Sequence, residues 1–500
     1  MNTTSIRKEL LRWGGLMAGI YLIYVIAFPL IPYIYLDGNM LDLEMVLRNG
    51  ARWFIWVYIF GLIILFYSFW RVTKLIHEFS KQNKDQAASM RKLILRIGVS
   101  CGIILLFLYP ITAIDVAVYV VNARNWVLNG GNPLTVPPET FPEDPYIHLA
   151  GEYVNKTSPY GPVWEIIGSM PIRVGITDIA SGIIAMKVIS LLAYIFMAWL
   201  IGWQSKQQDE KQAVSQVTVL TFFALNPLVM LEALGNGHND MLMIAFIMLG
   251  LILWQKNYWM WATVALTLAS LVKLPALIFI PLFGLASLTA TDSWRTRLMR
   301  TFGMGIISLG IFFSLYRLMG PFPDVFNGII ESFARRSFSP AYALHVVVRE
   351  FSPDLARAIL ANTRNLFLLI YVFIAIQFMR KKLTLLEAGF LVYLVQIILV
   401  NAFRFWYPLW LLPFAVLNLN SRTYWRTFLF SVAVEFSILS YYILWRWHMR
   451  YWEISALAPY WNYFTIMTPF TVAWAFTLPF VGDVVGWVKD KARYKDTLWI

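Results

Sequence analysis

The sequence contains little charge and almost no cysteine. Only 14% of its 500 residues are charged, whereas 59% are hydrophobic. The apolar residues form repeated runs long enough to cross the roughly 30 Å hydrocarbon layer of a bilayer. This composition excludes a soluble globular protein. The single cysteine, Cys101, lies within an apolar run, which excludes an intrachain disulfide framework and indicates a packing residue.

Metal-binding and nucleotide-binding motifs are also missing. The five histidines are scattered, and none forms a pair at metal-ligand spacing. His238 with Asp240 is the only conceivable pair. No glycine-rich phosphate loop is present. We therefore expect no metal ion and no other cofactor.

The formal charge of +13 does not indicate nucleic-acid binding. Lys and Arg cluster in short loops between apolar runs, such as 71–92 and 295–300, as the positive-inside rule expects. No extended basic surface remains once these loops are set aside, so nucleic acid is not an expected partner. The basic loops all fall on one side of the predicted topology. They predict a multi-pass plasma-membrane protein with both termini in the cytoplasm.

The apolar runs predict an all-α polytopic membrane protein with about fourteen membrane segments. We divide the chain into an N-terminal hairpin with a basic cytoplasmic loop (1–92), a core (93–300) and a C-terminal membrane module (301–500). The predicted segments are 14–35, 53–70, 93–114, 179–203, 213–231, 241–254, 259–271, 275–288, 302–319, 365–378, 383–400, 407–419, 428–445 and 464–481.

Three long connections are predicted to project outward: 115–177, 320–362 and 445–463. The first begins with Asp115 at the end of a membrane helix, continues as a helix to Leu128, and then becomes rich in glycine and proline. The break at Lys273 and Pro275 predicts two half-length helices, because proline removes a helix hydrogen bond. One long tilted helix is the alternative.

Asp115 is the first candidate for chemistry. A carboxylate at the water-facing end of a membrane helix can be partly desolvated, which suits a general base. An ordinary helix-boundary charge is the alternative. Helical spacing brings Tyr119 and Asn122 onto nearly the same face, where they and Arg124 could bind sugar hydroxyls. Tyr119 could instead anchor at the interface while Arg124 contacts lipid headgroups.

The sequence GNGHND, 235–240, is predicted to form a short outward turn after Glu232. A turn needs glycine, but it does not need His238, Asn239 and Asp240 together. We therefore interpret these polar residues, together with Glu232, as sugar or acceptor contacts. A turn followed by an Asp240 helix cap explains part of the pattern equally well.

Several cations could hold an anionic phosphate. They are Lys187 within an apolar segment, Lys273 at the helix break, Arg124, Arg335, Arg336 and Arg404. Lys187 could instead snorkel outward, Lys273 could end a half-helix, and the arginines could belong to an aromatic belt. Glu435, within another apolar segment, is interpreted as an interhelical hydrogen-bond partner.

Five sequence stretches occur in the order typical of one family. They are DVAVYVVNARNWVLNGGNPL (115–134), SPYGPVWE (158–165), ALNPLVMLEALGNGHNDMLM (224–243), LVKLPALIFIPL (271–282) and FRFWYPLWLLP (403–413). Together they resemble the GT-C fold glycosyltransferases that use polyprenyl-phosphate sugars, and in particular the bacterial polyprenyl-phosphate-mannose-dependent mannosyltransferases.

The resemblance implies a catalytic role for Asp115 and places the second turn and Lys273 at the cavity. It also implies that the hairpin formed by the first two predicted segments is an addition outside the core. The chain departs from the family pattern at Asn122, where an acidic residue is frequent. Within the matched stretches we expect further sugar or acceptor contacts from Asn132, Tyr160, Trp406 and Tyr407.

We therefore expect an inverting glycosyltransferase that moves a hexose, which the resemblance implies to be mannose, from a polyprenyl phosphate to a glycan or glycolipid. Membrane lipids, the polyprenyl-phosphate sugar and the acceptor are the expected partners, at the outer face of the plasma membrane. Phosphate leaves without a general acid, so the protein must supply a base and cations. A lipid-linked glycan ligase or polymerase is one alternative. A lipid-linked sugar flippase or transporter, with Glu435 at midplane, is the other.

Overall fold

The structure, a computed structural model, describes residues 2–35, 53–204, 215–335, 339–419 and 421–439. Within these ranges the regular structure is helical, and β-structure is limited to one isolated bridge between Pro29 and Leu108. The all-α prediction is confirmed. Helices suit a lipid environment because they satisfy their backbone amides within a single segment.

The first group of helices runs to residue 204. It comprises α1 (Thr3–Ala27), α2 (Leu30–Tyr35), α4 (Phe54–Gln82), α5 (Lys84–Ser89), α6 (Arg91–Leu105), α7 (Asp115–Asn129), η1 (Pro138–Thr140), η2 (Ile147–Tyr153), α8 (Pro162–Arg173) and α9 (Ile179–Gln204).

The second group runs from residue 216 to residue 439. It comprises α10 (Gln216–Ala224), η4 (Val229–Gly235), α11 (Asp240–Gln255), α12 (Trp259–Val272), η5 (Leu274–Ile278), α13 (Phe279–Leu288), α14 (Trp294–Met319), η6 (Asp324–Phe326), α15 (Asn327–Ala334), α16 (Pro340–Arg349), α17 (Pro353–Met379), α18 (Leu385–Leu399), η7 (Tyr407–Leu411), α19 (Leu412–Leu417) and α20 (Ser421–Leu439).

Five of the described helices are long and apolar enough to cross a membrane: α1, α4, α9, α14 and α17. A sixth span results if α10 and η4, which are bent by 54° at a short break, are counted together. Other apolar stretches, such as α11 and α12, are shorter. These helices make the chain a membrane protein, but the predicted count of about fourteen segments is not confirmed. The segment 464–481 and the loop 445–463 lie outside the described residues.

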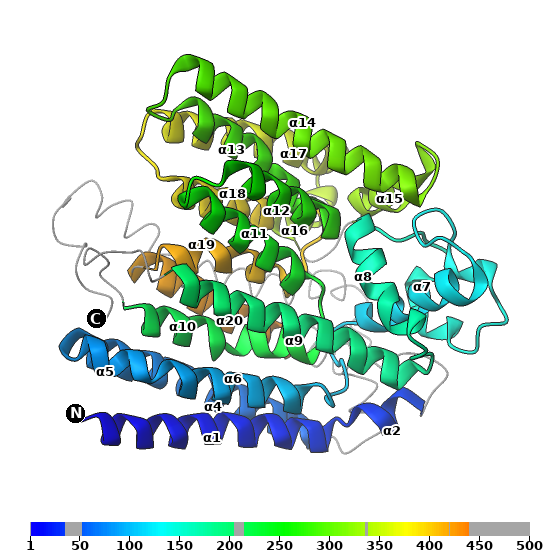
Figure 1. The fold of residues 1–500 in the computed structure, drawn as a ribbon. Helices are drawn as coiled ribbons and strands as arrows, with labels where there is room; N and C mark the ends of the chain where they lie inside the picture. The colour runs from blue at the N-terminus through cyan, green and yellow to red at the C-terminus, as the bar shows by residue number, and fades with distance from the viewer. Residues whose placement is uncertain (1, 36–52, 205–214, 336–338, 420, 440–500) are drawn as a thin grey trace.

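The N-terminal hairpin packs directly on the rest of the bundle. α1 lies against both α4 and α6, as Figure 1 shows at the lower edge of the molecule. Tyr24 of α1 donates a hydrogen bond to the carbonyl oxygen of Tyr58 in α4, at 2.6 Å. A side chain at Gly61 would clash with the ring of Tyr24, so this glycine permits the close approach of the two helices.

The path between α6 and α7 differs from our prediction. We expected a membrane helix from 93 to 114 that ends at Asp115, but α6 ends at Leu105 and Asp115 is the first residue of α7. Pro110 lies between them and cannot donate a backbone hydrogen bond, which prevents one continuous helix. Asp115 therefore lies at the beginning of a separate helix, where the helix dipole favours an anion.

Lys187 of α9 lies beneath this break. Its side chain is fully buried, and its Nζ donates to the carbonyl oxygens of Leu105, at 3.4 Å, and of Leu108. The last carbonyls of a helix lack partners within the helix. Lys187 therefore satisfies the end of α6, and this contact gives no support to the predicted snorkelling or phosphate contact.

The predicted break after α12 is confirmed. Lys273 has extended backbone angles and separates α12 from the short helix η5, in which Pro275 occupies the first turn. The alternative of one long tilted helix is wrong. The helices α7 and α8 gather at the end of the bundle opposite the start of α1 (Figure 1).

Candidate active site

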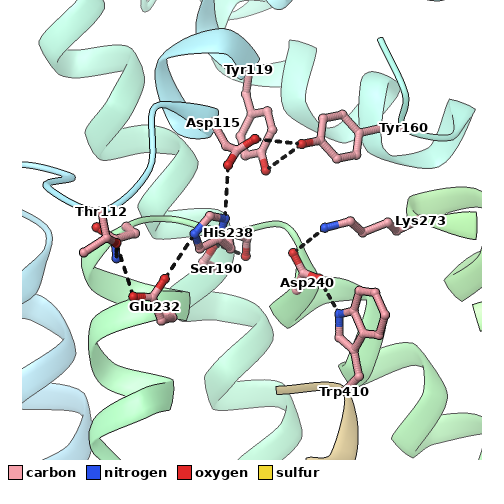
Figure 2. Close-up of polar contacts among 11 residues, drawn as sticks. Thr112, Asp115, Tyr119, Tyr160, Ser190, Glu232, His238, Asp240, Lys273 and Trp410 are labelled. Carbon is pink, nitrogen blue, oxygen red and sulfur yellow. Dashed lines mark hydrogen bonds and ion pairs between the residues drawn. The ribbon is translucent and has the colours of Figure 1, made fainter. Parts of the chain in front are cut away.

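Five segments that are distant in the sequence meet at the break between α6 and α7. Asp115 and Tyr119 come from α7, and Tyr160 comes from the turn before α8. The turn between η4 and α11, the end of α12 and the short helix η7 supply the other polar side chains. Figure 2 shows these side chains pointing toward one another. The first predicted loop, the GNGHND turn and the lysine before the helix break therefore form one site.

Two buried tyrosines form a chain of hydrogen bonds that ends at Asp115. Tyr160 Oη donates to Asp115 Oδ1 at 3.2 Å, and Tyr119 Oη donates to Tyr160 Oη at 3.4 Å. Burial, and secondarily the Asp115 carboxylate, raises the pKa of each phenol well above its ordinary value. Both hydroxyls therefore keep their protons, and Tyr160 orients one oxygen of Asp115.

The other oxygen of Asp115 faces His238. Nδ1 of His238 lies 3.9 Å from Asp115 Oδ2, and Nε2 lies 3.3 Å from Glu232 Oε2. The imidazole stacks on Trp406 with ring centroids 3.8 Å apart. Glu232 Oε1 accepts a hydrogen bond from Thr112 at 3.2 Å. The imidazole thus lies between two carboxylates, as Figure 2 shows.

The turn that carries His238 is buried rather than exposed. Every residue from 221 to 240 is buried, so the predicted outward turn exists as a turn but not as a surface loop. Gly237 has φ +73°, and a Cβ there would press against Val116 and Lys187. Only glycine fits this backbone conformation in this space.

Lys273 faces the same site from the end of α12. Its Nζ donates to Asp240 Oδ2 at 2.7 Å, and Trp410 Nε1 donates to Asp240 Oδ1 at 2.5 Å. Asp240 therefore binds side chains, and Asn239 occupies the N-cap position of α11 instead. The ammonium also lies 5.6 to 6.0 Å from the ring centroids of Tyr160, Trp406, Tyr407 and Trp410.

A tight contact brings Tyr160 to Lys273. The backbone N–H of Gly161 donates to the carbonyl oxygen of Val272 at 3.2 Å. A Cβ at Gly161 would clash with the backbone of Leu271, so this close approach requires glycine. The turn before α8 is thereby fixed against the end of α12, and Tyr160 lies between Asp115 and Lys273.

Glu165 supports this turn from α8. Ser158 Oγ donates to Glu165 Oε1 at 2.5 Å, and the backbone N–H of Tyr160 donates to Ser158 Oγ at 3.3 Å. Burial raises the pKa of Glu165 to about 7, although the Ser158 hydrogen bond opposes that shift. Glu165 was not predicted as a site residue, because only its place in a matched stretch singled it out.

Two predicted ligands from the first loop hold the loop itself. Arg124 Nε lies 3.0 Å from Asp144 Oδ2, and its guanidinium also binds the Thr177 carbonyl oxygen. Asn132 binds the carbonyl oxygen of Met319 and the backbone N–H of Leu134. These contacts support structural roles. Asn122 is buried in the middle of α7.

The predicted arginines divide into two groups. Arg404 interacts electrostatically with Asp115 and Tyr153, and Arg335 lies over the ring of Tyr153 at 4.5 Å. Both therefore border the site. Arg336 lies outside the described residues. Tyr153 was not predicted, because its loop carries no motif that would single it out.

Asn239 was predicted from the sequence as a site residue, whereas Trp410 was not. Asn239 is fully buried, and in the described part of the chain neither polar atom of its side chain has a hydrogen-bond partner. Trp410 lies in a matched stretch but was not predicted as a site residue. A tryptophan in an apolar run resembles a packing residue unless its indole N–H has a known partner.

Within the described ranges, no three His, Cys, Asp or Glu side chains are placed to hold a metal.

Residues 17–289 match the family described as alpha-(1->6)-mannopyranosyltransferase, N-terminal domain. The chain belongs to this family. The match begins at residue 17 and therefore includes most of the N-terminal hairpin. The site residues up to Lys273 all fall within the match.

The sequence identity between this chain and individual relatives is low. The chain is 25% identical over 177 residues to alpha-(1->6)-mannopyranosyltransferase A of Corynebacterium glutamicum, covering 35% of each protein. It is 28% identical over 148 residues to alpha-(1->6)-mannopyranosyltransferase B of the same organism, covering 27% of this chain and 24% of the relative. The corresponding A protein of Mycobacterium tuberculosis is 24% identical over 178 residues, covering 35% of this chain and 33% of the relative.

The similarity thus spans about a third or less of the length of these relatives. No solved structure matches the chain.

Proposed function

We propose that this protein is an inverting mannosyltransferase that transfers mannose from a polyprenyl phosphate to a glycan or glycolipid acceptor. An α(1→6) linkage is the product that the names of its relatives suggest. The one observation that carries this proposal is the position of Tyr160. Its hydroxyl binds Asp115, and its ring lies 5.6 Å from the Lys273 ammonium. A base and a cation thus face one small space.

The reaction needs these two groups. The acceptor oxygen bonds to the anomeric carbon as its proton passes to Asp115, and the bond from that carbon to the phosphate oxygen breaks. The departing phosphate gains negative charge, which Lys273 and the nearby Arg404 and Arg335 stabilise. Phosphate is a weak base, so no acid has to protonate it. We expect no metal ion in this mechanism, because these three cations provide the compensating charge.

The aromatic side chains suit the sugar. Trp406, Tyr407 and Trp410 surround Lys273 together with Tyr160. Aromatic faces pack against the C–H face of a hexose, while the amide of Asn239, which has no partner among the described residues, can bind a hydroxyl. The exposed apolar faces of α14 and α17 suit contact with membrane lipid. A GT-C-like organisation, with the parts 1–92, 93–300 and 301–500, belongs to the same proposal.

The test is transfer by purified full-length protein in lipid nanodiscs. The donor is synthetic short-chain polyprenyl-phosphate mannose with labelled mannose, and the acceptors are α(1→6)-linked mannose oligomers. Polyprenyl-phosphate glucose is the matched control donor. We expect mannose transfer that continues after thorough chelation. Donor movement across the bilayer without transfer would favour the flippase alternative, and joining of preformed lipid-linked glycans would favour the ligase alternative.

Orientation needs a separate test. We propose that the site faces the outside of the plasma membrane and that both termini face the cytoplasm. Cysteines introduced at Thr140 and Asn327 should react with impermeant reagents in intact cells, whereas a cysteine at Gln86 should not. The native Cys101 is buried and serves as the background. Reaction at Gln86 alone would reverse the proposed orientation.

A further inference from the structure

The environment of His238 does not resemble a sugar-binding site. His238 and Glu232 have no exposed surface, whereas the Asp115 side chain is 12% exposed. A sugar can therefore reach Asp115, but His238 and Glu232 lie behind it. A buried imidazole between two carboxylates is instead suited to receive a proton on one nitrogen and release one from the other.

The contacts of the ring suggest which nitrogen carries the proton. Nε2 lies 3.3 Å from the Glu232 carboxylate, while Nδ1 lies 3.9 Å from Asp115. A carboxylate accepts hydrogen bonds, so the closer one favours a proton on Nε2. The lone pair of Nδ1 then faces Asp115. The stack on Trp406 fixes the plane of the ring.

We propose that Asp115, His238 and Glu232 form a proton relay, in which His238 receives the proton that Asp115 removes from the acceptor hydroxyl. This inference rests on the proposed function. The acceptor O–H bond breaks and its proton passes to Asp115 Oδ2. That proton moves to His238 Nδ1 while the proton on Nε2 moves to Glu232 Oε2. Asp115 is again an anion, and the proton rests on Glu232.

The relay has a physical advantage during the reaction. Positive charge develops on the sugar ring as the phosphate departs, and an anionic Asp115 beside it stabilises that charge better than a neutral acid does. Neither ring nitrogen makes an aligned hydrogen bond within the described part of the chain. For the transfer, the 3.9 Å gap must shorten by roughly 1 Å and the 3.3 Å contact to Glu232 must align, and such contacts often tighten only when substrate binds. After product release the proton returns to water through Asp115, which is the exposed member of the three.

Glu232 has the surroundings of a terminal acceptor. Thr112 donates to its Oε1, and Thr112 Oγ1 in turn accepts from the amide of Asn236. Glu435 of α20, also fully buried, interacts electrostatically with Glu232. The other titratable or charged groups around the relay are Tyr119, Tyr153, Tyr160, Lys187, Asp240, Arg404 and Tyr407.

The first arm of the test needs no activity. Nitrogen NMR of the full-length protein in nanodiscs, with ¹⁵N-labelled histidine, reports the tautomer of each imidazole. The His238 signal is identified by its loss in His238→Gln. We expect the proton on Nε2 and the lone pair on Nδ1. A fully protonated ring, or a proton on Nδ1, would overturn the relay.

The second arm measures turnover. His238→Gln and Glu232→Gln keep polar side chains but cannot pass the proton, so kcat should fall by about 10- to 100-fold with donor affinity unchanged, in line with general-base effects. Imidazole added to His238→Gly should restore part of the activity. The control is His77→Gln, a buried histidine in α4, which should leave kcat unchanged.

The two proposals fail in different ways. Unchanged kcat in both relay variants, or no rescue by imidazole together with weakened donor binding, would overturn the relay while the mannosyl transfer stands. Absence of transfer by the wild-type protein would overturn the proposed function, and the relay with it.

Discussion

The site has two charged sides, one formed by Asp115 and the other by Lys273. They are built alike, but the distance from the charged group to its buried partner differs. Asp115 and Lys273 are each slightly accessible, with side chains that are 12% and 13% exposed, and each has a fully buried partner behind it. Behind Lys273, the carboxylate of Asp240 lies at 2.7 Å. Behind Asp115, the imidazole of His238 lies at 3.9 Å.

This difference fits two different tasks. A phosphate requires a cation whose charge and position stay fixed, and the short contact to Asp240, held in turn by Trp410, fixes the Lys273 ammonium. A general base must change its protonation state, and a longer contact to His238 leaves Asp115 free to do so. The following predictions test whether the two sides separate in this way.

The largest effect is expected from Asp115→Asn. Asparagine keeps the shape and can still accept from Tyr160, but it cannot take the proton of the acceptor. Turnover should fall by about 10²- to 10⁴-fold, whereas donor affinity should change little. Transfer and donor binding by purified protein in nanodiscs provide the measurement. Near-normal transfer would remove Asp115 from the mechanism and leave Asp240 as the next base to test.

Lys273→Met should have the second largest effect, on the other side of the site. The variant keeps most of the stem and removes the charge. A hydrogen bond to a charged group contributes about 1.5 to 3 kcal/mol, so donor affinity and turnover should both fall by about 10- to 100-fold. Loss of turnover without loss of donor affinity would show that the two sides do not differ as proposed.

Lys187→Met is the matched control for that variant. From the sequence alone, Lys187 and Lys273 were equivalent candidates for the phosphate. In the structure Lys187 binds the carbonyl oxygens at the end of α6 instead. The variant should therefore lower the thermal midpoint of the protein and leave the donor affinity of the folded fraction unchanged. Weakened donor binding would return Lys187 to the site.

Lys187 and Lys273 show which property of the site could not be predicted from the sequence. The ordered motifs identified Asp115, the GNGHND turn and Lys273, and the structure brings all three together. A motif fixes which residue types are present, but not which backbone groups lie opposite them after folding. The target of Lys187 exists only because α6 ends at Leu105, and our prediction continued that helix to 114.

Burial is the second property that could not be predicted. Polar residues in a glycine-containing turn normally indicate a surface loop. Here α7 and the residues before it cover the turn, so His238 became an internal partner of Asp115, and Glu232 an internal partner of His238, instead of surface ligands. Trp410 was overlooked for a related reason, because its role depends on the neighbouring Asp240 rather than on its own stretch of sequence.

Tyr160→Phe tests the residue that contacts both Asp115 and Lys273. The ring remains beside Lys273, but the hydrogen bond to Asp115 is lost. A single hydrogen bond contributes about 0.5 to 1.5 kcal/mol, so turnover should fall by about 3- to 10-fold with donor affinity unchanged. The comparison is made with the same transfer and binding assays. A change confined to donor affinity would place Tyr160 with the lysine side alone.

The smallest effect on turnover is expected from Glu165→Gln, because Glu165 lies outside both charged sides and acts only through Ser158 and the turn that carries Tyr160. Its effect should appear in stability and depend on pH. Burial raises the pKa of Glu165 from an ordinary value of 4.5 to about 7. The folded protein therefore binds a proton between these values that the unfolded chain releases, so stability falls as pH rises through this window and stays lower above it.

Glutamine does not titrate in this pH range, so Glu165→Gln should gain stability relative to wild type as pH rises from 5 to 8. The difference should approach about 3 kcal/mol, the linkage equivalent of the pKa shift. Thermal midpoints of both proteins across this pH range, with the exposed Glu143→Gln as control, provide the measurement. A constant difference between Glu165→Gln and wild type would mean that the carboxyl does not titrate there. In that case Ser158 holds the Tyr160 turn with equal strength at every pH.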